Sequence, residues 1–279
     1  MGGTLLRATV ILGVLLAPVG AYASFVEPDR LVVERTEIEM PEERAGDRPI
    51  RVALIADIQF EQLGRHEHEA IERVLAEEPD LILLSGDYHQ GTRPSFDRQR
   101  AAIRELFARL RAPGGVFAVQ GDSEGMDKAR RVFAGTGIRL LLDERATVQI
   151  ADRRVSIAGL ALRYWSPRAQ RVMSRFERTP GASDIRLLLA HRPDAVLDLT
   201  PASRIDLVLS GHTHGGQLQV PFIGPPTTAS DVPRAVAAGG LHELNGNAVY
   251  VSRGIGVERG QAPRLRLGAT PEVSILELR

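Results

Sequence analysis

The sequence predicts an α/β domain built from two packed mixed sheets with helices outside them. Three observations support this fold class: short apolar runs typical of buried strands, amphipathic helix patterns between them, and a central stretch that changes to antiparallel-type strands. The 279 residues are enough for one large α/β domain. Because no linker rich in Pro, Gly or Ser divides the sequence, we expect a single domain over residues 50–279.

Strand and helix patterns alternate from residue 50 onward. Apolar runs at 51–56, 80–85 and 116–119 predict three buried strands, with helices over 67–77 and 96–110 between them. Later segments continue the pattern and add antiparallel neighbours. The later strands are predicted at 146–150, 155–159, 185–190, 206–210, 248–252 and 273–278, and a further helix at 167–178.

The first 23 residues have the features of a targeting or anchoring segment. Arg7 precedes an apolar run, and Ala21-Tyr22-Ala23 has the small-x-small pattern of a signal-peptidase site. Residues 8–23 are close to the shortest length that spans a bilayer, so a cleaved signal peptide and a retained membrane anchor both stay open. In both cases Arg7 favours a cytoplasmic N-terminus, which predicts an extracytoplasmic (periplasmic) location in the cell envelope. Residues 24–49 are expected to be a lead-in segment.

The composition excludes several kinds of chemistry. The chain has no cysteine, so thiol catalysis, disulfides and cysteine-ligated metals are ruled out, and any metal must be held by nitrogen and oxygen atoms. Lys128 is the only lysine and therefore the one weak candidate for lysine-based covalent chemistry. The 35 basic and 35 acidic residues give a formal net charge of zero, so we expect no nucleic-acid binding driven by overall charge.

Chemically active side chains follow the predicted strands where each strand ends. Asp57, Asp87 and Asp122 come after the first three strands, the last two directly after a glycine, and His191 follows the strand at 185–190. The carboxyl ends of parallel strands form the ligand crevice of open α/β sheets. We therefore expect these four residues to converge.

Two histidines after the strand at 206–210 extend this group. His212 and His214 are two residues apart, and in extended backbone such residues point to the same face. Each could hold one ion of a metal pair. For an isolated H-x-H pattern the alternative is a polar loop with two exposed histidines. The preceding aspartates and His191 favour the metal site.

These residues, in this order, resemble the calcineurin-like metallophosphoesterase superfamily. The matching blocks are Asp57-x-Gln59, Gly86-Asp87, Gly121-Asp122, His191 and Gly211-His212-Thr213-His214. Segments 189–194, 210–217 and 252–256 are similar to its membrane-associated branch of YkuE- and YaeI-type phosphodiesterases. The resemblance covers residues 28–278 and implies a four-layer α/β/β/α sandwich of two mixed sheets.

The resemblance also implies a binuclear metal centre and its ligands. The first ion would be held by Asp57, Gln59, Asp87 and His214, and Asp87 would bridge to a second ion held by Asp122, His191 and His212. The ions are divalent, and Mn, Zn, Fe and Mg all remain open. A water activated by both ions would attack phosphorus. Arg192 and Arg253 are candidates for binding a substrate phosphate, although both also fit ordinary surface-loop arginines.

Three residues depart from the superfamily pattern. Gln59 replaces a histidine and offers only a neutral amide oxygen, whereas Asp122 replaces an asparagine and adds a negative charge. Ser123 replaces the histidine expected to protonate the leaving group. Loss of a general acid costs about 10² to 10⁴ in rate. Nearby candidates for that proton are Glu124 and His89, the latter expected to lie exposed in a loop.

The sequence therefore predicts metal-dependent hydrolysis of a phosphoester or pyrophosphate bond. The expected substrate is a phosphorylated small molecule or lipid head group, and membrane association through the N-terminus remains open. A pyrophosphate bond has a good leaving group and needs less acid catalysis than an alkyl ester. The alternative is a metal-binding protein of the same fold that recognises a phosphorylated ligand with weak or no catalysis, which Ser123 and Gln59 keep open.

Overall fold

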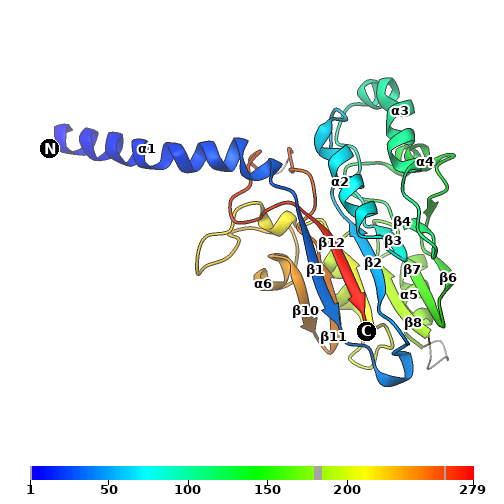
Figure 1. The fold of residues 1–279 in the computed structure, drawn as a ribbon. Coiled ribbons are helices and arrows are strands. Elements are labelled where there is room, and N and C mark those ends of the chain that lie inside the picture. The colour runs from blue at the N-terminus through cyan, green and yellow to red at the C-terminus, as the bar shows by residue number, and fades with distance from the viewer. Residues whose placement is uncertain (1, 179–183, 261) are drawn as a thin grey trace.

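Two six-stranded mixed sheets form the centre of the computed structural model, which describes residues 2–178, 184–260 and 262–279 (Figure 1). In spatial order, the first sheet contains β1 (Val32–Ile38), β12 (Glu272–Leu278), β2 (Ile50–Ile55), β3 (Leu81–Leu84), β4 (Val116–Ala118) and β5 (Arg139–Leu140). The second contains β10 (Gly240–Leu244), β11 (Asn247–Val251), β9 (Leu207–Ser210), β8 (Asp184–Leu189), β7 (Arg153–Gly159) and β6 (Glu144–Ile150). Strands β2 to β5 are parallel, as are β7, β8, β9 and β11.

The helices lie between these strands along the chain. The α-helices are α1 (Gly2–Phe25), α2 (Arg65–Ala76), α3 (Arg93–Ala108), α4 (Met126–Phe133), α5 (Pro167–Arg178) and α6 (Arg234–Ala237). Short 3-10 helices are η1 (Glu27–Asp29), η2 (Glu42–Arg44), η3 (Pro193–Asp198) and η4 (His214–Gly216).

Three apolar clusters separate four layers. Because side chains alternate along a strand, β2 directs Ala53 and Ile55 toward α2, α3 and α4, and directs Val52 and Leu54 toward the second sheet. On the far side of the second sheet, Leu188 of β8 packs in a third cluster with residues of α5, η3 and α6. The predicted α/β/β/α sandwich of two mixed sheets is therefore confirmed.

The first sheet begins before residue 50. Strand β1, within the stretch 24–49 that was expected to be a lead-in, pairs in parallel with β12 from Val32 opposite Glu272. The sequence pattern missed it because β1 is an edge strand whose residues are mostly half-exposed and include Glu34, Arg35 and Glu37. Strands β5 and β10 and helices α4 and α6 were also not predicted.

Helix α1 extends away from the sheets at the N-terminus (Figure 1). Its C-terminal end contacts the body of the protein, where the Ala23 carbonyl accepts a hydrogen bond from the Arg266 amide at 2.9 Å. Over the described ranges of the chain, no helix combines the length and the apolar character needed to cross a membrane.

Candidate metal centre

The residues expected to converge lie just beyond the carboxyl ends of parallel strands from both sheets. They follow β2 (Asp57, Gln59), β3 (Asp87), β4 (Asp122), β8 (His191) and β9 (His212, His214). Since the two sheets pack face to face, the loops at these ends meet at one edge of the sandwich.

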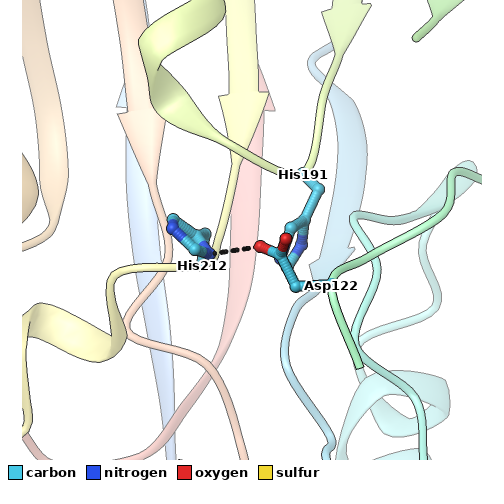
Figure 2. A group of neighbouring side chains, drawn as sticks. All are labelled: Asp122, His191 and His212. Atoms are coloured by element: carbon cyan, nitrogen blue, oxygen red, sulfur yellow. Dashed lines mark ion pairs between the residues drawn. The ribbon is translucent and has the colours of Figure 1, made fainter. Parts of the chain in front are cut away.

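One group joins the two sheets at this edge (Figure 2). The Asp122 Oδ2 lies 3.0 Å from His212 Nδ1 and 3.2 Å from His191 Nε2. Metal–ligand bonds of about 2.0 to 2.2 Å place neighbouring ligand atoms about 3 to 3.5 Å apart. Asp122, His191 and His212 therefore have the spacing of a shared metal shell.

A second group shares His191 with the first. Asp57, Asp87 and His191 each offer a ligand atom, and these atoms lie within 4.8 Å of one another. The His191 Nε2 is 3.5 Å from Asp87 Oδ1, and its Nδ1 is 3.9 Å from Asp57 Oδ1. All three side chains are buried. The two groups form one continuous cluster of carboxylates and imidazoles.

Backbone groups orient these side chains. The His191 Nδ1 donates to the Ser85 carbonyl at 2.8 Å, and the His212 Nε2 donates to the Ala229 carbonyl at 3.0 Å. The Asp57 Oδ2 accepts from the His212 amide at 2.9 Å. Each contact leaves the opposite atom of the side chain available, as outer partners of metal ligands characteristically do.

Several buried polar atoms at this edge have no hydrogen-bond partner in the described structure. They are Asp57 Oδ1, Gln59 Oε1, His191 Nε2 and His214 Nε2. An unsatisfied buried polar atom costs about 1 to 3 kcal/mol. Four such atoms on predicted ligands fit cations that would satisfy them, so the residues present suit a metal centre.

The backbone at these positions adopts an unusual conformation. Positive φ angles occur at Asp57 (48°), Gln59 (49°), Asp87 (54°), His212 (72°) and His214 (50°). Such angles cost free energy for residues other than glycine and cluster at functional sites. The folded sheets hold these loops in a shape that the free chain disfavours.

Two glycines allow the loops to approach each other. A side chain at Gly121 would collide with the Asp87 backbone and carboxylate, and one at Gly211 would collide with the Asp57 carboxylate. The glycines preceding Asp122 and His212 are therefore required by close packing around the cluster.

Burial and neighbouring charges shift the pKa values of several residues in the cluster. Burial of Asp57 raises the pKa of its carboxyl to about 7. Burial alone would lower the pKa of His191, but the Asp87 and Asp122 carboxylates outweigh it and raise that pKa to about 10. Burial opposes ionisation of Asp122 as well, yet the adjacent side chains of His191, His212 and Arg192 lower its pKa. The cluster thus favours positive charge at its centre, and a divalent cation would displace the His191 proton.

Gln59 and His214 lie at one side of the cluster with distinctive partners. The Gln59 Nε2 donates to Asp87 Oδ2 at 3.3 Å and to Glu258 Oε2 at 2.5 Å. The His214 Nδ1 lies 3.2 Å from Arg266 Nη2. Burial and the Arg266 charge lower the pKa of His214 well below its usual value, so its ring is neutral.

Both candidates for the leaving-group proton are buried. The expected exposed position of His89 is wrong: the ring is fully buried, with centroids 5.3 Å from Phe60 and 5.5 Å from Phe96. The Glu124 carboxylate accepts from the amides of Asp87, Tyr88 and Gly121 at 3.0 to 3.1 Å and from the Ser123 hydroxyl at 2.8 Å. The hydrogen bonds of Glu124 therefore link the loop after β3 to the loop after β4.

The two candidate phosphate-binding arginines are placed differently. Arg192 forms a two-pronged contact with Asp122, with Nε–Oδ2 at 3.1 Å and Nη2–Oδ1 at 2.6 Å, at the border of the cluster. Arg253 pairs instead with Glu272 and Glu34 and is not among the residues that line the cavity at the cluster. Of these two arginines, only Arg192 contacts a predicted metal ligand.

A cavity of about 330 Å³ opens over the cluster. Asp87, Asp122, His212 and His214 form part of its wall, and Glu258 lies in the same wall. Glu258 was not predicted, because it follows β11 in a loop without a ligand-like spacing; no pattern in the sequence would have found it. A space of this size fits a small phosphorylated group beside the cluster.

Comparisons with known proteins agree with this geometry. The sequence profile described as calcineurin-like phosphoesterase matches residues 50–216. The chain is 29% identical to phosphodiesterase YaeI of Escherichia coli, with 92% of both chains covered. It is 32% identical to the metallophosphoesterase YkuE of Bacillus subtilis, over 72% of this chain and 68% of that one.

Among solved structures, the fold is similar to that of the Haemophilus influenzae NAD nucleotidase, with a TM-score of 0.50 and 13% identity. The match covers 75% of this chain and 46% of the nucleotidase, so the present chain spans about half the length of that protein. This likeness concerns the fold alone.

Proposed function

We propose a substrate class for this chain, which belongs to the calcineurin-like phosphoesterase family and is a metal-dependent phosphoesterase. The proposed substrates are phosphodiesters or pyrophosphates with a good leaving group, in a small molecule or a lipid head group. One observation carries the proposal. Of the described residues lining the cavity, the histidines are His212 and His214, both predicted metal ligands. No further imidazole is placed there to protonate a leaving alkoxide, so substrates that leave without a proton are favoured.

The proposed metal centre contains two divalent ions, held by the residues predicted from the sequence. Asp122, His191 and His212 would hold one ion, and Asp57, Gln59 and His214 the other, with Asp87 between them. The short contacts around Asp122 and the unpartnered atoms of Asp57, Gln59 and His214 support this division. When bound, such ions polarise a phosphoryl oxygen and lower the pKa of water. The protein's own residues set the charge and shape of the site, and Arg192 is positioned to hold Asp122.

A series of esters with different leaving groups tests the substrate class. Mn²⁺-loaded protein should hydrolyse bis-p-nitrophenyl phosphate and a nucleoside diphosphate sugar. It should hydrolyse a dialkyl phosphodiester about 10² to 10⁴ times more slowly, which is the rate factor that a general acid usually contributes. Equal rates across the series would contradict the proposal. Failure to hydrolyse any ester would leave only the recognition of a phosphorylated ligand.

We also propose that the enzyme acts in the cell envelope, on the extracytoplasmic side. Residues 1–23 would serve as a signal peptide or a membrane anchor, supported by Arg7, the apolar run after it and the small residues Ala21 and Ala23. Cell fractionation followed by N-terminal sequencing distinguishes the two. A mature chain that begins at Ser24 indicates cleavage, whereas an intact N-terminus in the membrane fraction indicates an anchor. Recovery in the cytosol would refute the proposal.

A further inference from the structure

The side-chain amide of Gln59 is held at only one of its two ends. Its Nε2 donates to Glu258 Oε2 at 2.5 Å and more weakly to Asp87 Oδ2 at 3.3 Å. Its Oε1 is buried and has no hydrogen-bond partner among the described atoms. A glutamine amide is nearly symmetrical in shape but not in chemistry, since only the oxygen can bind a cation. Which end of Gln59 is free therefore decides whether it can act as a ligand.

The Glu258 carboxylate is fixed by contacts of its own. Its Oε1 accepts from Gln90 Nε2 at 3.1 Å and from the Gly260 amide at 2.5 Å. The Glu258 amide donates to Gln217 Oε1 at 2.6 Å, which anchors the backbone of this loop. A carboxylate held on several sides presents its remaining oxygen, Oε2, to Gln59 in one place.

We propose that Glu258 is a positioning residue that makes Gln59 a metal ligand. An ionised carboxylate can only accept hydrogen bonds, so Glu258 binds the nitrogen end of Gln59 and leaves Oε1 for a cation. The second hydrogen of Gln59 Nε2 points to Asp87 Oδ2 at 3.3 Å, so both acceptors favour the same orientation of the amide. This inference rests on the proposed first ion at Asp57, Gln59, Asp87 and His214.

Metal titration of the full chain tests the inference without relying on turnover. In Mn²⁺ binding followed by calorimetry and electron paramagnetic resonance, Glu258→Ala should weaken the first ion about 10- to 100-fold, the usual effect of losing an outer partner. The second ion, at Asp122, His191 and His212, should be unchanged.

A second background isolates the role of the amide. In Gln59→Glu, both ends of the side chain at position 59 are oxygen atoms, so adding Glu258→Ala should weaken the first ion by less than about 3-fold. Glu105→Ala, at an exposed position of α3, is the matched control and should change neither ion. Thermal unfolding in chelator shows whether each variant folds.

The possible results separate this inference from the proposed function. An unchanged first ion in Glu258→Ala overturns the inference, and so does an equal loss in the wild-type and Gln59→Glu backgrounds, which would indicate a general effect of charge or packing. Wild-type protein that binds no ion at Asp57 refutes both the inference and the proposed binuclear centre. Loss of turnover with both ions retained affects the proposed function alone.

Discussion

The two halves of the candidate metal centre differ in charge and in orientation. In the half around Asp122, an ionised carboxylate lies 3.0 and 3.2 Å from two imidazole nitrogens. Carbonyl oxygens of Ser85 and Ala229 hold both rings by the opposite nitrogen. This half has its ligand atoms assembled before any ion binds.

The half around Asp57 is poorer in charge. Burial raises the pKa of Asp57 to about 7, and Gln59 is neutral. His214 Nδ1 lies 3.2 Å from the guanidinium of Arg266, whose positive charge opposes a cation at the ring. From this comparison we expect an ion at Asp122 to bind more tightly than an ion at Asp57.

The largest effect is expected from Asp87→Ala, which breaks both halves at once. Asp87 lies between them, 3.5 Å from His191 and hydrogen-bonded to Gln59. The metal ions are expected to stabilise the transition state by several kcal/mol, and losing this stabilisation corresponds to a fall of about 10³-fold or more in kcat. Elemental analysis should find fewer than two ions per chain, alongside the rate on bis-p-nitrophenyl phosphate. Two retained ions would show that Asp87 does not bridge.

The two histidines after β9 compare the halves directly. His212→Ala should weaken the tighter ion by roughly 100-fold, because His212 is oriented and contacts Asp122. His214→Ala should weaken the looser ion by only about 10-fold, because Arg266 already opposes its binding. Mn²⁺ titration of each variant measures both values. The reverse order would disprove the inequality of the halves.

The smallest expected effect is a change with pH in the Tm of the metal-free protein. His191 has an ordinary pKa of 6.5 that is raised to about 10 in the fold. A raised pKa stabilises the folded state fully below pH 6.5, and this contribution is lost as the pH rises toward 10. One pKa unit is about 1.4 kcal/mol, so the Tm in chelator should fall by several degrees across this window.

Two controls sharpen the pH experiment. His191→Gln lacks the titrating ring, so its Tm should fall much less with rising pH. The Tm of metal-loaded wild-type protein should also not show this fall, because a bound ion requires His191 without its extra proton. A Tm of the metal-free protein that stays constant or rises between pH 6.5 and 10 would contradict the charge distribution described for the cluster.

The positions of the predicted ligands could be foreseen because each follows the end of a strand. A buried parallel strand leaves a strong apolar signal, and its carboxyl end has a fixed place in the fold. Asp87, Asp122 and His191 therefore converge as expected, although they are far apart in sequence. The sheets were predictable for the same reason, apart from the edge strand β1 with its half-exposed residues.

Positions set by side-chain packing could not be foreseen. Burial of His89 depends on Phe60 and Phe96 meeting from separate segments, which no local pattern reveals. The contacts of Arg253 with Glu34 and Glu272 join both ends of the chain. Glu258 reaches Gln59 across 199 positions of sequence. Such pairs are properties of the folded chain, and each appears ordinary when its own segment is considered alone.

The left-handed backbone at Asp57, Asp87 and His212 has a consequence for how ions enter. The entropy of shaping these loops is lost during folding, so little more should be lost when a cation arrives. Exchange of metals would then be limited by dehydration of the incoming ion and not by rearrangement of the loops. Protein refolded in chelator should accept Mn²⁺ as quickly as protein stripped of metal in its native state.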